Sequence, residues 1–119
     1  MFQPTTLANA RLFYVARPAD ADGDVDKHIE AAIAMHGKRV SGGPAVAAPS
    51  SAHIRVDYSD RWHWDIVMYL RSLDVWFRDS ATGQLIATGR FKQQFPHSFP
   101  DPPKKCREVI DSIFSAAYN

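Results

Sequence analysis

The chain has 119 residues, a formal net charge of +1 at pH 7 and an apolar content of 45%, which suits one domain over residues 1–119 with a core of ordinary size. The near-neutral charge gives no strong attraction to nucleic acid or to an anionic membrane, so neither partner is expected. The single cysteine excludes an internal disulfide, and no stretch approaches the roughly 18 apolar residues that span a membrane.

Residues 1–9 are expected to form a flexible tail, and Met1–Thr6 fits neither a signal peptide nor a lipid attachment site. The run Arg11–Ala16 then predicts a strand. A helix follows, with Asp24 as its N-cap and Gly37 as its stop. Apolar residues at helical spacing predict its buried face: Val25, Ile29, Ala32, Ile33 and His36.

The acidic loop before this helix, Asp20–Asp26, has the sequence DADGDVD. It contains part of the pattern of a calcium-binding loop, but Glu30 falls short of the position of the closing glutamate. A loop that caps the helix is the favoured interpretation. Farther along, Ser41–Ser51 (SGGPAVAAPSS) is low in complexity and predicts a mobile loop. Phe95–Pro100 predicts a second irregular connection.

Alternation of apolar and polar residues from residue 54 onward predicts an antiparallel hairpin. If the chain turns over Ser59–Arg61, apolar residues pair on one face: Tyr58 with Trp62, Val56 with Trp64, and Ile54 with Ile66. On the other face, away from the helices, opposite charges pair: Asp57 with His63, and Arg55 with Asp65. A slip of one residue would set apolar side chains against charged ones, which favours this register.

The next hairpin turns at Ser80–Gly83, where glycine takes a positive φ without steric cost. This turn pairs residues of the two flanking strands: Trp76 with Thr88, Asp74 with Arg90, and Leu73 with Phe91. The apolar residues occupy even positions up to Leu70 and odd positions from Leu73 onward. The sequence therefore predicts either a β-bulge or a strand break at Arg71–Ser72.

The last helix is predicted to open at Asp101, which precedes two prolines that suit a first turn. Its apolar stripe consists of Cys106, Val109, Ile110, Ile113, Phe114 and Ala117. Because Cys106 lies on this stripe, a buried and unreactive thiol is expected. A reactive thiol is the alternative, since Lys104, Lys105 and Arg107 are close in sequence.

These elements follow the order strand, helix, three strands, helix (β-α-β-β-β-α). We expect an α+β fold, a two-layer sandwich in which an antiparallel meander and an N-terminal strand carry both helices on one face. The residues expected to be buried together are Ile29, Ile33, Ile54, Val56, Trp64, Ile66, Val75, Phe77, Val109, Ile110 and Ile113.

The strand ending in Asp79, the turn Ser80–Gly83, the returning strand Gln84–Arg90 and the terminal amphipathic helix resemble small envelope lipoproteins of proteobacteria, largely of unknown function. The topology also resembles the amino-terminal domain of TolB. The resemblance extends over roughly residues 10–117 as a pattern and is sharpest in Asp79–Arg90, a structural motif without a catalytic residue. It implies a periplasmic or outer-membrane-associated location and a role in binding or assembly, with an envelope protein as partner.

The sequence has no GxSxG motif, no phosphate-binding glycine loop and no paired metal-ligand spacing. We therefore expect no enzyme and no catalytic, cofactor or metal site; a small hydrolase is the least favoured alternative. His53 and His63 share a predicted sheet face with Asp57 and Asp65, which would suit a metal or acid–base site. Cross-strand ion pairs on an exposed face are the favoured interpretation of the same residues.

The candidate partner-binding face consists of Val67, Tyr69 and Trp76, large groups expected on the side away from the helices. Nucleic-acid binding on the sheet is the alternative, with stacking and charge from Trp76, Tyr69, His63, Arg55 and Arg90. The carboxylates of Asp57, Asp65 and Asp74 oppose it, because they weaken the positive field that a phosphate backbone needs. A non-catalytic envelope domain for binding or assembly is the preferred function.

Overall fold

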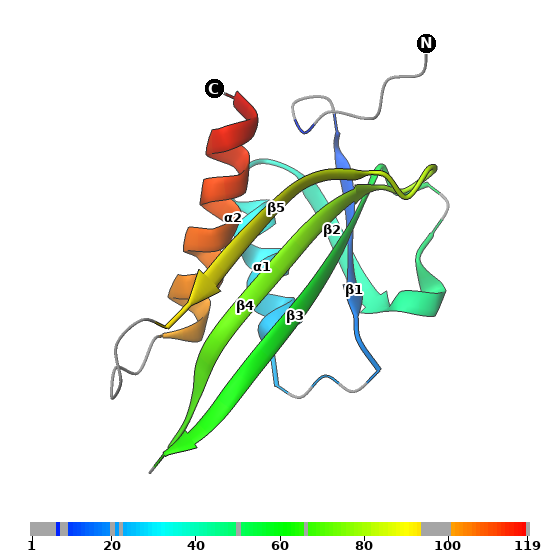
Figure 1. Cartoon of the computed structure of the whole chain (residues 1–119). Helices are drawn as coiled ribbons and strands as arrows, with labels where there is room; N and C mark the ends of the chain where they lie inside the picture. Colours follow the sequence, from blue (N-terminus) through cyan, green and yellow to red (C-terminus); the bar gives the residue numbers. More distant parts are fainter. Residues whose placement is uncertain are drawn as a thin grey trace.

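Five strands and two long helices build the fold of this computed structural model (Figure 1). They are β1 (Leu12–Arg17), α1 (Val25–Ala34), β2 (Arg39–Pro44), β3 (Ile54–Asp65), β4 (Val67–Asp79), β5 (Leu85–Lys92) and α2 (Pro102–Tyr118), with a 3-10 turn at Ala45–Ala47 after β2. The structure describes residues 7, 10–19, 21, 23–49, 51–65, 67–93 and 101–118, with the backbone alone for 64–68 and 117–118. The expected connection at Phe95–Pro100 lies outside the described residues.

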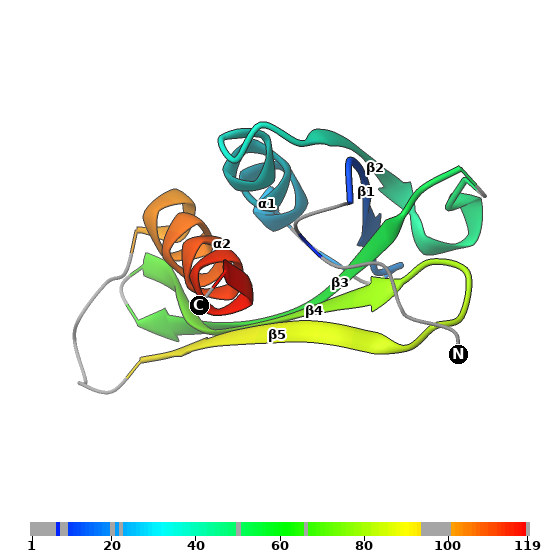
Figure 2. The ribbon, with the colours of Figure 1, turned by 90° about the horizontal axis from the view of Figure 1, so that it is seen from above.

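The strands form one mixed sheet in the order β2-β1-β3-β4-β5. Strands β1, β2 and β3 are parallel, and β3, β4 and β5 form an antiparallel meander. Both helices lie on one side of this sheet (Figure 2), with α1 over β1 and β2 and α2 over β4 and β5. The predicted α+β sandwich is therefore confirmed. No helix in the described part of the chain is long and apolar enough to cross a membrane.

Strand β2 was not expected, and it replaces the first part of the predicted mobile loop Ser41–Ser51. Its pairing with β1 brings the backbone close to two side chains that leave no room for a Cβ atom. A Cβ atom on Gly42 would lie 2.5 Å from Glu30 Oε2, and one on Gly43 would lie 2.8 Å from the hydroxyl oxygen of Tyr14. The Tyr14 hydroxyl donates to the Pro44 carbonyl at 2.7 Å. The glycines therefore serve close packing in a strand.

The register predicted for the first hairpin is wrong, because β3 does not turn at Ser59–Arg61 but continues to Asp65. The observed partners of Val56, Asp57 and Tyr58 are Phe77, Trp76 and Val75. Arg55 faces Arg78 rather than Asp65, and His63 faces Tyr69 rather than Asp57. No glycine, proline or asparagine interrupts the alternation at residues 59–61, so a longer strand satisfies the same apolar pattern with more sheet hydrogen bonds.

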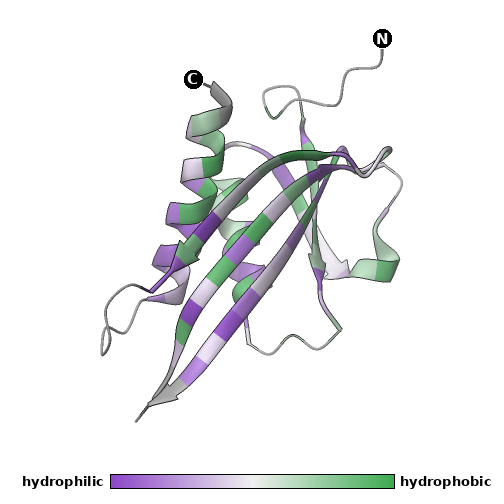
Figure 3. Ribbon diagram, in the orientation of Figure 1, coloured by the Kyte–Doolittle hydropathy of each residue, from purple (hydrophilic) through white to green (hydrophobic). Residues whose placement is uncertain are grey.

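A β-bulge in β4 resolves the predicted change of phase between Leu70 and Leu73. Arg61 pairs with Ser72 and Trp62 pairs with Leu70, so Arg71 is the extra residue. Leu70 and Leu73 are both fully buried. The alternating bands of hydrophilic and hydrophobic residues along β3 and β4 show this pattern on the ribbon (Figure 3). The prediction of an irregularity at Arg71–Ser72 is confirmed, and a bulge rather than a strand break accounts for it.

The second hairpin has the predicted register, with Trp76 opposite Thr88, Asp74 opposite Arg90 and Leu73 opposite Phe91. Gly83 has a φ of 76°. The turn is held by Asp79, which is buried: its Oδ1 accepts from the backbone N–H groups of Ala81 at 2.9 Å and of Thr82 at 3.1 Å. One side chain therefore satisfies two donors that the chain reversal would otherwise leave without partners.

The core lies between the sheet and the two helices. Three rings join a strand from each half of the sheet to α2: Phe13 and Phe77 are 5.6 Å apart, and Phe114 lies 6.0 Å from the first and 5.8 Å from the second. Every predicted core residue whose side chain is described is buried; the side chains of Trp64 and Ile66 lie outside the described part. Leu7 is also buried, at 2% exposure, beside this cluster.

Replacing Phe77 by alanine should destabilise the protein by about 3–5 kcal/mol, because it removes a fully buried ring that contacts two others. Denaturant unfolding followed by tryptophan fluorescence measures the change. Lys104→Ala, an exposed position on α2, is the control and should change the stability by less than about 0.5 kcal/mol. Equal stability of Phe77→Ala and wild type would contradict the core described here.

Replacing Asp79 by alanine should cost about 1–3 kcal/mol, since the N–H groups of Ala81 and Thr82 lose their acceptor. Asp79→Asn keeps an oxygen in the same position and should recover part of this loss. The same unfolding experiment compares the two variants. If asparagine and alanine destabilise equally, the hydrogen bonds to the turn are not the source of the effect.

Candidate functional site

The face of the β3-β4-β5 sheet opposite the helices is the main candidate surface (Figure 2). Alternation directs apolar side chains to the core and leaves polar and charged ones on the open side. Basic groups outnumber acidic ones there: Arg55, Arg61, Arg71, Arg78, Arg90 and Lys92 against Asp57 and Asp74. The open face is therefore positive in a chain whose total charge is only +1.

A groove crosses this open face near the bulge. We call it the basic groove; it is lined by Ser59, Arg61, Trp62, Arg71, Ser72, Asp74, Trp76, Arg90 and Lys92. Its residues come from paired rows of the sheet, since Arg61 faces Ser72 and Ser72 faces Lys92. The next row consists of Ser59, Asp74 and Arg90. Neighbouring strands thus present their side chains to the same groove.

Some cations of the open face are paired and others are not. Arg90 Nε lies 3.0 Å from Asp74 Oδ1, and Asp57 lies between Arg55 (3.0 Å) and Arg78 (3.7 Å). Arg61, Arg71 and Lys92 have no carboxylate partner among the described residues. Three uncompensated cations therefore converge on the basic groove, and like charges held together favour the approach of an anion.

The predicted partner-binding residues do not form one patch. Trp76 is half-buried and lines the basic groove. Tyr69 is only 8% exposed and its ring lies edge-on to His63, with centroids 5.5 Å apart. The side chain of Val67 lies outside the described part, so its place in a binding face stays a prediction. Sequence reasoning missed Arg61, Arg71 and Lys92, although the phase change already marked Arg71 as an irregular position.

The two histidines considered for a metal or acid–base site are far apart. His53 precedes β3, whereas His63 lies ten residues farther along the same strand, which corresponds to about 33 Å. Asp57 is engaged with two arginines. Over the residues that the structure describes, no group of three or more histidine, cysteine, aspartate or glutamate side chains is placed to hold a metal ion.

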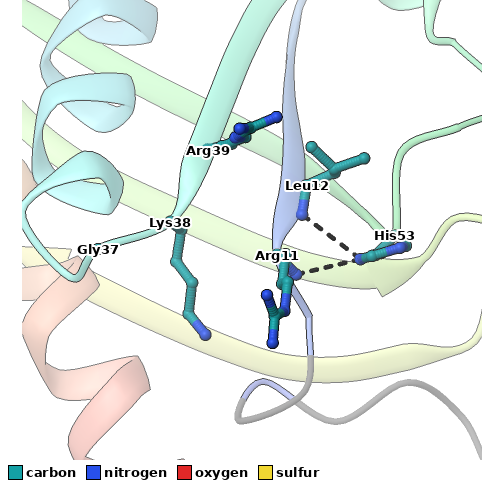
Figure 4. Close-up of a pocket in the computed structure, with 6 residues that line it drawn as sticks. All are labelled: Arg11, Leu12, Gly37, Lys38, Arg39 and His53. Atoms are coloured by element: carbon teal, nitrogen blue, oxygen red, sulfur yellow. Dashed lines mark hydrogen bonds between the residues drawn. The ribbon is translucent and has the colours of Figure 1, made fainter.

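A second hollow lies at the end of β1 and β2 where both strands begin, lined by Arg11, Leu12, Gly37, Lys38, Arg39 and His53 (Figure 4). His53 Nδ1 accepts from the backbone N–H groups of Arg11 at 3.0 Å and Leu12 at 3.4 Å, so the ring carries its proton on Nε2. Lys38 Nζ donates to the Leu7 carbonyl at 3.0 Å, and Arg39 points away from Arg11 and Lys38. These groups hold the chain together and do not converge on one point.

The acidic loop is organised by an arginine rather than by a metal ion. Arg17 Nη1 donates to Asp26 Oδ1 at 2.8 Å and to the Gly23 carbonyl at 3.1 Å, and its Nη2 donates to the Ala21 carbonyl at 3.1 Å. Asp24 occupies the N-cap position of α1 without a side-chain hydrogen bond to the helix. Asp20 and Asp22 lie outside the described residues. The Asp26 carboxylate is thus already used in an ion pair.

Cys106 lies in the core on α2, as predicted. Burial, with a smaller contribution from Asp60, raises the pKa of its thiol from an ordinary 9.0 to about 12. Burial, followed by the nearby carboxylates of Asp26 and Asp60, likewise raises the pKa of Tyr58. Both groups therefore stay protonated at neutral pH, and neither supplies a nucleophile or a base.

Comparison with known proteins reveals similarity in structure but not in sequence. No protein-family model matches the chain, and no curated protein is significantly similar to it. PelC of Paraburkholderia phytofirmans, a dodecamer, matches in two crystal forms: with a TM-score of 0.57, 14% identity, and 97% of this chain and 93% of PelC covered; and with 0.56, 14%, 89% and 85%. At this identity the likeness extends to the fold alone.

Lipoproteins also occur among the similar structures, at lower scores. A minor lipoprotein of Acinetobacter baumannii has a TM-score of 0.39 and 16% identity, with 90% of this chain and 87% of that chain covered. A lipoprotein of Neisseria meningitidis has 0.41 and 13%, with 92% and 99% covered. Scores at this level carry no argument about function. The likeness to TolB stays a prediction.

The thiol of Cys106 should react with a thiol reagent at pH 8 only after the protein is unfolded, because the raised pKa lowers its thiolate fraction about a thousandfold. The folded state retains this proton more strongly than the unfolded state. Its stabilising effect is therefore complete below pH 9 and is lost as the pH rises toward 12. Cys106→Ala should weaken that decline, and rapid labelling of the native protein would contradict the buried position.

Proposed function

We propose that this protein is a non-catalytic binding or assembly domain of the bacterial cell envelope, and that its partner contacts the open face of the β3-β4-β5 sheet. One observation carries the proposal: neither helix covers this face (Figure 2), and its basic groove holds three cations without carboxylate partners among the described residues. Unpaired charges beside a half-buried tryptophan are typical of a surface that meets another molecule.

The envelope location is supported by the resemblance of Asp79–Arg90 and the last helix to envelope lipoproteins. The elements that carry this resemblance form as expected, with the turn at Gly83 and the helix Pro102–Tyr118. The likeness to PelC adds support for assembly, since PelC forms a dodecamer. A second copy of this chain is therefore one of the partners to be tested for.

Binding of a single-stranded nucleic acid is the second candidate function. The basic groove favours it, because cations around an aromatic ring on a sheet suit phosphates and stacked bases. The carboxylate of Asp74 lies within the groove and opposes it. An envelope location would also keep such a ligand away from the protein, so we place this candidate second.

A photo-crosslinking residue at position 76 should form adducts in the cells that produce this protein, because Trp76 lies in the groove that we assign to the partner. Illumination of whole cells followed by immunoblotting of the envelope fraction detects the adducts. An adduct with the mass of two chains indicates assembly of copies, and one of another mass indicates a different envelope component.

The matched control carries the same crosslinker at Arg107, an exposed position on α2. It should give no adduct, since it lies on the opposite layer of the sandwich. Equal adducts from both positions, or none from position 76 in a folded protein, would contradict a role for the open face. Recovery of the protein and its adducts from the cytoplasmic fraction alone would contradict the envelope location.

A further inference from the structure

We propose that the basic groove binds an acidic polysaccharide of the uronic-acid class, with Arg61, Arg71 and Lys92 on its carboxylates and Trp76 against a sugar ring. This inference rests on the proposed function, because it assigns a ligand class to the same open face. It depends on three features of the groove: where its cations lie, what lies between them, and how far the aromatic ring is from them.

The cations span three strands at one level of the sheet. Arg61, Ser72 and Lys92 form a continuous row through the pairing of β3 with β4 and of β4 with β5. Neighbouring strands are about 4.8 Å apart, so the backbones of Arg61 and Lys92 are separated by about 10 Å. The bulge adds Arg71 beside this row. Charges spaced in this way suit an extended chain with repeated anionic groups better than a single small anion.

Trp76 lies one side of this row along β4. Four residues separate it from Ser72, which corresponds to about 13 Å. Its ring is half-buried, so it is held in place while one part stays accessible. Flat aromatic side chains with a polar N–H pack well against the apolar C–H face of a sugar and bind a hydroxyl at their edge. Charge at one end and a ring at the other therefore fit a chain-shaped ligand.

The centre of the groove separates a polysaccharide from a nucleic acid. Ser59, Ser72 and Asp74 lie between the row of cations and Trp76. Sugar hydroxyls donate hydrogen bonds, and a carboxylate or a serine oxygen accepts them. A phosphodiester backbone offers only acceptors and negative charge, which Asp74 would repel. Asp74 is also fixed by its ion pair with Arg90 at 3.0 Å, so it presents its second oxygen in a defined position.

The binding of a size-defined oligogalacturonide, measured by titration calorimetry at low salt, tests this assignment. Wild type should bind it, and neutral dextran should not bind. Arg61→Gln/Lys92→Gln should weaken the affinity about tenfold or more, because two charge-assisted contacts are lost. The matched control, Lys104→Gln/Arg107→Gln, removes the same two charges from exposed positions on α2 and should stay within about twofold of wild type. Trp76→Ala should also bind more weakly, with part of the loss recovered in Trp76→Phe.

Several results would overturn the assignment. Equal losses in both double variants would mean that net charge alone attracts the glycan, and equal or tighter binding of polyuridylate would point to the nucleic acid instead. No binding of the oligogalacturonide by folded wild type would exclude the ligand class. If crosslinks from position 76 still form in the envelope fraction, the proposed function survives that failure. If the crosslinks are absent as well, both proposals fall together.

Discussion

Leu70 and Leu73 must both reach the core, and three positions separate them. A regular strand points positions that differ by an odd number to opposite faces, so β4 meets this demand only by including one extra residue, Arg71. Both leucines are then fully buried. The same distortion leaves Arg71 and its neighbour Ser72 together at the groove. A packing requirement on one face thereby shapes the charged surface on the other.

The two hairpins show what local sequence can and cannot determine. Around Ser80–Gly83 the register was predicted correctly, because Gly83 and the capping carboxylate of Asp79 specify the turn. Around Ser59–Arg61 no residue specifies a turn, and the alternating pattern is satisfied equally by a tight hairpin and by a long strand. Pairing rules then chose a self-consistent but incorrect register. Patterns of period two fix which face a residue occupies; only turn chemistry or a third strand fixes its partner.

Strand β2 escaped prediction for a different physical reason. Its sequence RVSGGP has low intrinsic preference for a strand, and it becomes one because β1 offers a free edge and α1 lies above. Glu30 and Tyr14 occupy the space that side chains at Gly42 and Gly43 would need. Gly89 plays the same part at the other end of the sheet, where a Cβ atom would lie 2.8 Å from Ile113. Contacts between distant segments, absent from any local window, decide these positions.

The surface charge shows the same limit of sequence reasoning. A net charge of +1 suggested no electrostatic partner, yet an average over the chain conceals how its charges are distributed. The bulge and the strand pairing gather Arg61, Arg71 and Lys92 on one face, while acidic groups are used elsewhere: Asp26 with Arg17, Asp79 in a turn, Asp111 with His36. Carboxylates that hold the fold together are not available to neutralise the groove. The positive face therefore follows from the way the fold uses its acids, and only the three-dimensional pairing reveals it.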